Sequence, residues 1–495
     1  MNPLRSIVAA VGLALLAGCA AAPPPEPPPL RVPLPARDTA PGSWRPPRQA
    51  PPASASARPY RFPKVVWSEL PSGLEVATIT SKALPIVQLR VVVGGGKAAD
   101  GEKPGLSSIT ASLLEEGGAG SMSSRDLVTR IESLGAALSI DTGFDATVLG
   151  LAVTRDHLGE AMDLLGAVVT RPLMAPVELE KLKKRRSSRL TDAARQSGAW
   201  AAQMVLFKDL FALPSEQHPY ATFSPTAADL DKITLADCRA FHKKFYVPKN
   251  TFVVVAGDTT PEAARAAVAK AFAAYAGADA PTISFTDPNR PEARKITVVD
   301  RPRSTHSDIF VAALGPERSD KRWAAAAVAN QILGGGVAGR LFLDLRQERS
   351  LADATRSGIT ELRHGPTLWS AYAGAETQKT GLALAALLDN LGRLTTTAPT
   401  EAEVADAARH LISSSAVKLD TLGAVADELV HHRVYGLPDD HDDRYRKELG
   451  EVTAPLALKA ASDHLLRGRE IIVVAGDASI IGPLLSPFGA VKVAR

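Results

Sequence analysis

Cysteine is nearly absent from this chain, which contains only Cys19 and Cys238 among its 495 residues. If Cys19 serves another purpose, no pair remains for an intrachain disulfide, so packing alone must hold the fold together. We expect Cys238 to be a small packed residue on a helix over Leu235–Tyr246.

Strong net charge is missing too. A formal charge of +4 over 495 residues is too weak to indicate nucleic acid as a partner, and none is expected. One basic run stands out. We interpret it as a solvated helix face, with an acidic partner or an anionic lipid surface as the alternative; its members are Lys181, Lys183, Lys184, Arg185, Arg186 and Arg189.

No hydrophobic run is long enough to cross a membrane. The apolar stretch Ile7–Leu16 has ten residues, whereas a span needs roughly twenty, so residues 1–18 are expected to be a cleaved signal peptide. Leu16–Cys19 resembles the lipobox of bacterial lipoproteins, in which the cysteine is acylated; an ordinary cleavage site that contains a cysteine is the alternative. Because Ala20 follows, and not Asp, the resemblance implies an exported lipoprotein on the periplasmic face of the outer membrane.

Proline is concentrated in a segment that lacks apolar runs. Residues 20–59 hold 14 of the 37 prolines, a composition that cannot bury a core. With Cys19, this segment is expected to form a semi-extended tether over residues 19–59. At ~3.1 Å per residue it reaches on the order of 120 Å.

An internal repeat follows the tether. Leu230–Asp258 and Leu449–Asp477 align without a gap at an offset of 219 residues, and each reads as a Thr-led amphipathic helix followed by an apolar strand. The strand Ile86–Gly96 has a similar counterpart in Asp308–Glu317. We therefore expect two homologous units, and we place them at residues 60–285 and 286–495.

A specific family resemblance begins where the first strand meets a helix over Leu106–Glu116. The stretch Gly105–Val148, which reads GLSSITASLLEEGGAGSMSSRDLVTRIESLGAALSIDTGFDATV, resembles the first unit of the insulinase-like zinc peptidases, the family of pitrilysin and the mitochondrial processing peptidase. The resemblance implies an α+β fold: two homologous units, each a mostly antiparallel sheet packed with helices.

The zinc motif of that family is not preserved. Active members carry H-x-x-E-H on this helix, with two histidines that bind zinc and a glutamate that activates water. The matching positions are Ser108, Ala111 and Ser112, and the position of the remaining ligand on the helix Pro176–Arg195 falls near Ser187. None of these residues is a normal zinc ligand, so we expect no catalytic residue, no metal and no cofactor in this chain.

The strand that holds substrate in active members and the histidine pattern also lack the expected residues. The Asn-Ala pair by which active members hold a peptide is replaced by Ser139 and Ile140. None of the ten histidines begins another H-x-x-E-H or H-E-x-x-H motif. Zinc is therefore expected only in a catalytic partner.

A glycine-rich stretch in the second unit keeps more of the family pattern. Gly334, Gly335 and Gly336, followed by Arg340, resemble a signature whose arginine and tyrosine contact peptide in relatives, so these four residues are the candidate peptide-binding site. The tyrosine position is Asp353. A helix C-cap followed by a loop is the alternative interpretation of the glycines.

The only histidine-rich cluster of the sequence is interpreted as structural, with metal binding as the alternative. His431, His432 and His441 lie near Asp439, Asp440, Asp442 and Asp443. Adjacent histidines on one helix are expected to point apart, and the aspartates to form a polar loop after Gly436–Pro438.

Three functions remain open. The leading hypothesis is a catalytically inactive, peptide-clamping subunit of a heteromeric periplasmic zinc peptidase, paired with a catalytic insulinase-family paralogue or, as an alternative assembly, with a second copy of itself. The second is a membrane-anchored scaffold or peptide-binding lipoprotein without a peptidase partner. The third is an active metallopeptidase with a nonstandard site.

The anchor is directly testable. We expect acylated Cys19 to keep the protein in the membrane fraction, because buried acyl chains supply the affinity. Cys19→Ser should release it into the soluble fraction or stall its processing, as measured by fractionation and mass spectrometry of the N-terminus. Equal membrane association of both forms would contradict the lipoprotein assignment.

Overall fold

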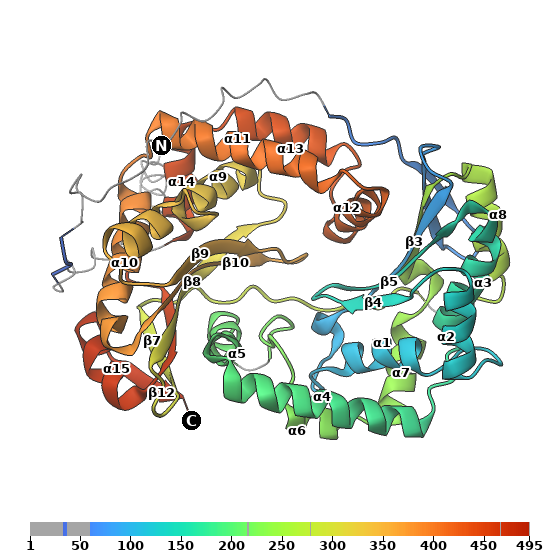
Figure 1. Ribbon diagram of the computed structural model, residues 1–495, viewed down its shortest axis with the longest axis horizontal. Coiled ribbons are helices and arrows are strands. Elements are labelled where there is room, and N and C mark those ends of the chain that lie inside the picture. The colour runs from blue at the N-terminus through green and yellow to red at the C-terminus, as the bar shows by residue number, and fades with distance from the viewer. Residues whose placement is uncertain (1–32, 37–59, 215–216, 278, 466, 495) are drawn as a thin grey trace, which may run out of the picture.

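The computed structural model describes residues 33–36, 60–214, 217–277, 279–465 and 467–494. Two six-stranded sheets organise the chain (Figure 1). In order across the sheet, the first contains β1 (Val66–Glu69), β2 (Glu75–Thr80), β6 (Thr251–Gly257), β3 (Ile86–Gly94), β5 (Ala146–Thr154) and β4 (Ser139–Thr142). The second contains β12 (Val491–Ala494), β7 (Lys295–Asp300), β11 (Ile471–Gly476), β8 (His306–Glu317), β10 (Pro366–Glu376) and β9 (Ala354–Thr360).

Helices accompany each sheet along the chain. Those of the first unit are α1 (Leu106–Glu116), α2 (Ser124–Ser133), α3 (Leu158–Thr170), α4 (Pro176–Gln196), α5 (Gly198–Leu210), α6 (Ala227–Asp231), α7 (Leu235–Phe245) and α8 (Pro261–Ala271). Those of the second are α9 (Trp323–Gly334), α10 (Thr380–Thr396), α11 (Glu401–Lys418), α12 (Leu422–Tyr435), α13 (His441–Gly450), α14 (Ala454–His464) and α15 (Ala478–Leu485). A π-helical turn covers Phe342–Glu348.

The two units share one topology, which confirms the predicted α+β fold. In both sheets a parallel pair, β2–β6 or β7–β11, is followed by three antiparallel neighbours. The repeat aligned in the sequence corresponds to α7 with β6 and to α14 with β11, and the bounds of α7 and α14 differ by the same 219 residues. The outermost strand breaks the symmetry, because β1 is antiparallel to β2 whereas β12 is parallel to β7.

Local signals explain why α7 forms where it does. Thr234 and Asp237 make a reciprocal capping box at its start, and Cys238, Phe241 and Phe245 recur at helical spacing and are buried. The free thiol of Cys238 is therefore a core group, as expected.

Each sheet is covered on one face by helices of its own unit and on the other by a helix of the opposite unit. α5, from the first half of the chain, packs its apolar side on β8 and β11, and α12, from the second half, packs on β3 and β6 (Figure 1). Leu206, Phe207 and Phe211 meet Phe310 and Val473 in one of these cores. We call α5 and α12 the exchanged helices.

Polar contacts hold the exchanged helices in register with the foreign sheet. Asp427 of α12 accepts from Arg90 Nε of β3 at 2.7 Å, and Arg433 of α12 pairs with Glu75 of β2. On the opposite side, Lys295 Nζ of β7 donates to Asp209 of α5 at 2.6 Å. The two halves of the sequence therefore form one interlocked body.

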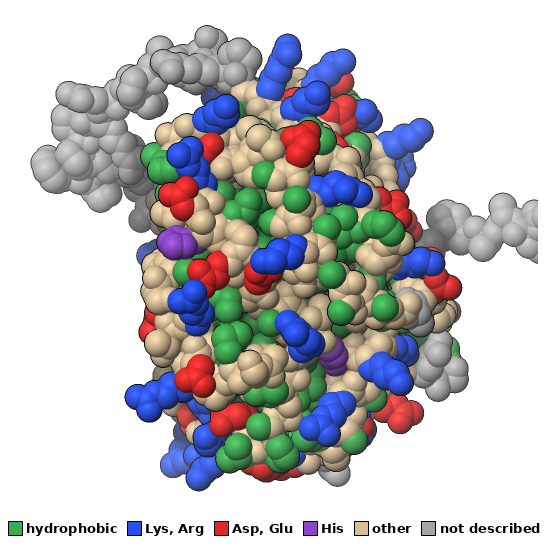
Figure 2. Space-filling model, turned by 90° about the vertical axis from the view of Figure 1, so that its right-hand side faces the viewer, with side chains coloured by type: hydrophobic (Ala, Val, Ile, Leu, Met, Phe, Trp, Pro, Cys, Tyr) green, Lys and Arg blue, Asp and Glu red, His purple; other side chains and the backbone are tan. Residues whose placement is uncertain are grey.

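The outer face of the first half carries mixed charge. Figure 2 shows lysine and arginine side chains interspersed with acidic and hydrophobic ones over this face. No helix in the described part of the chain has both the length and the hydrophobicity to cross a membrane.

Two differences from expectation concern polar segments. Asp442 and Asp443 do not lie in a loop: they form the first turn of α13, where the partial positive charge of a helix N-terminus stabilises carboxylates. Within the predicted tether, Leu34 packs against the hydrophobic core of the second unit. The Pro35 carbonyl accepts a hydrogen bond from Arg349. Cys19 and the signal segment lie outside the described residues.

The exchange makes a mutation in one unit destabilise the other. Leu429 of α12 is fully buried against the first sheet, so Leu429→Ala should lower the free energy of unfolding by about 2–5 kcal/mol. Hydrogen exchange should accelerate in β3 and β6, although both belong to the other unit.

Val417→Ala is the matched control, because this side chain is 70% exposed and its loss should change stability by no more than about 0.5 kcal/mol. An increase in hydrogen exchange confined to the second unit would contradict the interlocked architecture.

Candidate functional site

The degenerate zinc positions are placed by a well-anchored helix. α1 begins after Gly105, whose φ of +91° favours glycine, and an added Cβ there would lie 2.9 Å from both Leu230 and Pro225. The Asp100 carboxylate accepts from the backbone N–H groups of Gly105 and Ser107, both at 2.7 Å. Burial nevertheless raises the pKa of Asp100 to about 6. The start of α1 is thus fixed by buried contacts.

α1 lines a pocket of about 350 Å³ together with β4 and α4. Ser108, Ala111 and Ser112 come from α1, where the i, i+3 and i+4 spacing puts them on one face. The other lining residues include Ile140, Asp141 and Thr142 of β4 and Arg186, Arg189 and Leu190 of α4. The three motif positions therefore line one pocket.

A guanidinium group lies where the motif would hold its metal. Arg186 Nη1 donates to Ser108 Oγ at 3.1 Å, and Nη2 donates to Ser112 Oγ at 2.5 Å. Burial lowers the pKa of Arg186, opposed by the nearby Glu116. Arginine keeps its proton in proteins, so a fixed positive charge bridges the two serines and opposes entry of a second cation.

The residue on α4 that reaches the motif positions of α1 is Arg186, and not the neighbouring Ser187. Ser187 does not line the pocket, and its buried hydroxyl has no hydrogen-bond partner among the described residues. Gap-free alignment placed the missing ligand near Ser187, but a shift of one residue turns a helical side chain by about 100°. The importance of Arg186 was missed because its only signal was membership of the basic run.

The pocket opens beside an unpaired strand edge. Among the described residues, β4 is the last strand of the first sheet and pairs on one side only, with β5. Ser139 and Ile140, the residues expected at the peptide position, lie on this edge strand, and Ile140 lines the pocket. Such an edge offers free backbone groups that can accept one more strand.

The candidate peptide-binding residues of the second unit lie at the end of α9. Gly334 is the last residue of α9 and Gly335 caps it, which agrees with the helix C-cap interpretation. Arg340 makes a bidentate pair with Glu403, with Nε–Oε1 and Nη2–Oε2 distances of 2.7 and 2.9 Å. The hydrogen bond from Arg340 lowers the pKa of Glu403 to about 2. Asp353, which stands at the tyrosine position of the signature, pairs with His306, with an Oδ2–Nε2 distance of 2.9 Å.

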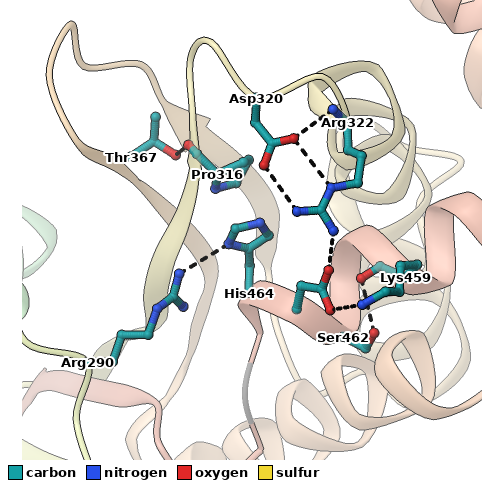
Figure 3. Close-up of polar contacts among 9 residues, drawn as sticks. Arg290, Pro316, Asp320, Arg322, Thr367, Lys459, Ser462 and His464 are labelled. Atoms are coloured by element: carbon teal, nitrogen blue, oxygen red, sulfur yellow. Dashed lines mark hydrogen bonds and ion pairs between the residues drawn. The ribbon is translucent and has the colours of Figure 1, made fainter.

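Another charged cluster joins α9 to α14 (Figure 3). Arg322 pairs with Asp320 and Asp463, Lys459 also reaches Asp463, and Arg290 Nη2 lies 3.5 Å from His464 Nδ1. Because these opposite charges satisfy one another, we interpret the cluster as structural.

The histidines of α12 do not point apart. His431 Nδ1 and His432 Nε2 both turn toward Glu428, and the three ligand atoms lie within 4.8 Å of one another. The expectation failed because one ring presents its δ nitrogen and the other its ε nitrogen, which brings adjacent residues to a common point.

Comparison with known proteins supports the same assignment in both units. The model of the insulinase family of peptidases, M16, matches residues 75–216, and the model described as the peptidase M16 inactive domain matches residues 232–411. The chain belongs to the insulinase-like peptidase family.

Relatives of this family align over most of the chain. An uncharacterized zinc protease of Streptomyces coelicolor is 24% identical over 84% of this chain and 89% of its own length. A crystal structure described as the peptidase M16 inactive domain from Pseudomonas fluorescens is 26% identical, with a TM-score of 0.77 over 83% of this chain and 98% of its own. A protease from Helicobacter pylori, 17% identical, shares the fold with a TM-score of 0.74, covering 83% of this chain and 99% of its own.

The position of Arg186 predicts how a zinc site can be rebuilt. Ser108→His, Ala111→Glu and Ser112→His together should not bind zinc at α1 while Arg186 remains. Adding Arg186→Glu should create the site, because it removes the positive charge and supplies a carboxylate ligand at the same place. Zinc per chain is measured by plasma mass spectrometry and counted above that of the parent protein.

Ser187→Glu added to the same triple variant is the control, because the side chain at 187 does not line the pocket. Equal zinc gain with Glu at 187 and at 186 would contradict this geometry.

Proposed function

We propose that this insulinase-family homologue is the non-catalytic subunit of a heteromeric periplasmic zinc peptidase. The observation that carries the proposal is the Arg186 guanidinium bound between Ser108 and Ser112. Three protein ligands and an activated water are needed for metal-dependent hydrolysis, and this pocket presents two hydroxyls and a cation in their place.

Peptide binding is supported by the geometry that remains. The pocket beside α1 borders the free edge of β4, so an extended peptide could pair with that edge through main-chain hydrogen bonds. Arg189 and Lys97 also line this pocket and favour acidic side chains or a peptide carboxylate. In this proposal the partner supplies zinc, and this chain contributes surface and charge.

The role of Arg340 depends on its pairing with Glu403. A clamp at Arg340, supported by Gly334–Gly336, requires the guanidinium to exchange its partner for a peptide carboxylate. The existing pair favours the second function, a membrane-anchored scaffold without a peptidase partner, in which Arg340 only ties its loop to α11. The two functions differ in what the arginine does when peptide is present.

Co-expression tests the proposed assembly. We expect this chain to form a stable complex with an exported paralogue that carries an intact H-x-x-E-H motif, and to raise the peptide turnover of that paralogue. Mass is measured by light scattering, and turnover with a quenched fluorescent peptide. A monomer that leaves turnover unchanged would reject the subunit function and favour the scaffold.

Arg340→Ala and Glu403→Gln form the matched pair within this experiment. If Arg340 clamps peptide, only Arg340→Ala should raise the KM of the complex several-fold. If the pair is structural, both substitutions should shift thermal stability alike and leave KM unchanged.

A further inference from the structure

A compact group of potential metal ligands lies away from the degenerate zinc positions. Glu428, His431 and His432 lie on α12, where spacings of three and four residues put them on neighbouring positions of one helix face. Asp442, from the first turn of α13, lies beside the group, with its Oδ2 3.3 Å from His432 Nε2. Because α12 is an exchanged helix, the group sits where the second half of the chain reaches over to the first sheet.

The distances within this group are unusual for hydrogen bonds. Glu428 Oε1 lies 3.5 Å from both His431 Nδ1 and His432 Nε2, and Asp442 Oδ2 lies 3.3 Å from His432 Nε2. Charge-assisted hydrogen bonds are usually about 2.7–2.9 Å long. In tetrahedral zinc sites with bonds of ~2.0–2.1 Å, neighbouring ligand atoms are about 3.4 Å apart. The spacing fits a shared cation better than a shared proton.

The same histidine provides an internal comparison. His431 Nε2 lies 2.7 Å from Glu361 Oε2, an ordinary hydrogen bond. Its other nitrogen, Nδ1, has no hydrogen-bond partner among the described residues, and the same holds for His432 Nε2 and Asp442 Oδ2. These buried atoms contact one another at ion-pair distances of 3.3–3.5 Å and make no hydrogen bond of ordinary length.

We propose that Glu428, His431 and His432 bind one divalent transition-metal cation beside Asp442, with zinc favoured by the nitrogen and carboxylate donors. His431 would bind through Nδ1 and His432 through Nε2. This site is independent of the proposed peptidase function and of the α1 pocket.

The surroundings have the features of an outer ligand shell. Glu361 accepts from His431 Nε2 and is held in turn by Arg318 Nε at 3.0 Å, an arrangement that leaves Nδ1 free to bind metal. Phe62 covers the ring of His432 at 5.1 Å between centroids.

Access is available from one side. His431 lines a pocket of about 430 Å³ between α12 and the edge of the first sheet, whereas the His432 side chain is only 1% exposed. A metal would enter past His431 and cross-link neighbouring turns of α12. Its effect would be structural, because it would stiffen the exchanged helix beside α13.

The test uses the purified full-length chain and metal alone. After chelation and dialysis, we expect the parent protein to bind one zinc or cobalt ion per chain in calorimetry, with a raised melting temperature. His431→Gln and His432→Gln each remove a ligand and should weaken metal binding by more than about 100-fold. Glu361→Gln changes only the outer shell and should weaken it by about 10–100-fold.

Two controls separate this site from others. His306→Gln with His410→Gln removes two exposed histidines and should leave affinity unchanged, and Ser112→Ala in the α1 pocket should do the same. Unchanged affinity in both the His431 and His432 variants would overturn the proposal, as would a parent protein that binds no zinc or cobalt at micromolar concentrations. In either case the group is a protonated histidine between carboxylates.

A variant that gains a spectroscopic signal distinguishes a lost metal ligand from a protein that fails to fold. His431→Cys should add a thiolate-to-cobalt absorption band that the parent lacks, because cysteine is a good ligand at the same position. A folded His431→Cys protein that binds cobalt without this band would place the metal elsewhere and reject the site.

Discussion

The structure depends on the reciprocal packing of α5 and α12. Each sheet is apolar on both faces, so neither can be solvated on the face that its own helices leave uncovered. The missing cover comes from the opposite unit in both cases. Duplication of a module therefore produced one indivisible body, and the homology between the units does not make either of them an independent domain.

The degenerate pocket keeps its position in the fold although its motif side chains are replaced. α1, α4 and β4 still surround it, and the arginine on α4 satisfies the two serines that stand at histidine positions. A cation is thus retained, but as a fixed side chain and not as an exchangeable ion.

Local patterns in the sequence predicted much of the fold but little of the long-range detail. The repeat located α7 and α14, and glycine and proline signals gave the bounds of α1, because capping and periodicity act within a few residues. The exchange of α5 and α12 could not be predicted, since their apolar faces do not specify which sheet they cover. The sequence did not reveal the role of Arg186, because a shift of one residue changes the direction of a helical side chain. It also placed Asp442 in a loop, because the exact start of a helix depends on one or two residues.

The contact of Leu34 and Pro35 with the second unit bears on how the protein stands relative to a membrane. If Cys19 carries the lipid, only residues 20–33 separate it from this contact, and at ~3.1 Å per residue they span about 45 Å. In that case this short segment, and not the whole proline-rich region, would set how far the folded body can stand from the bilayer. The second unit would then face the membrane, because the contact lies on that unit.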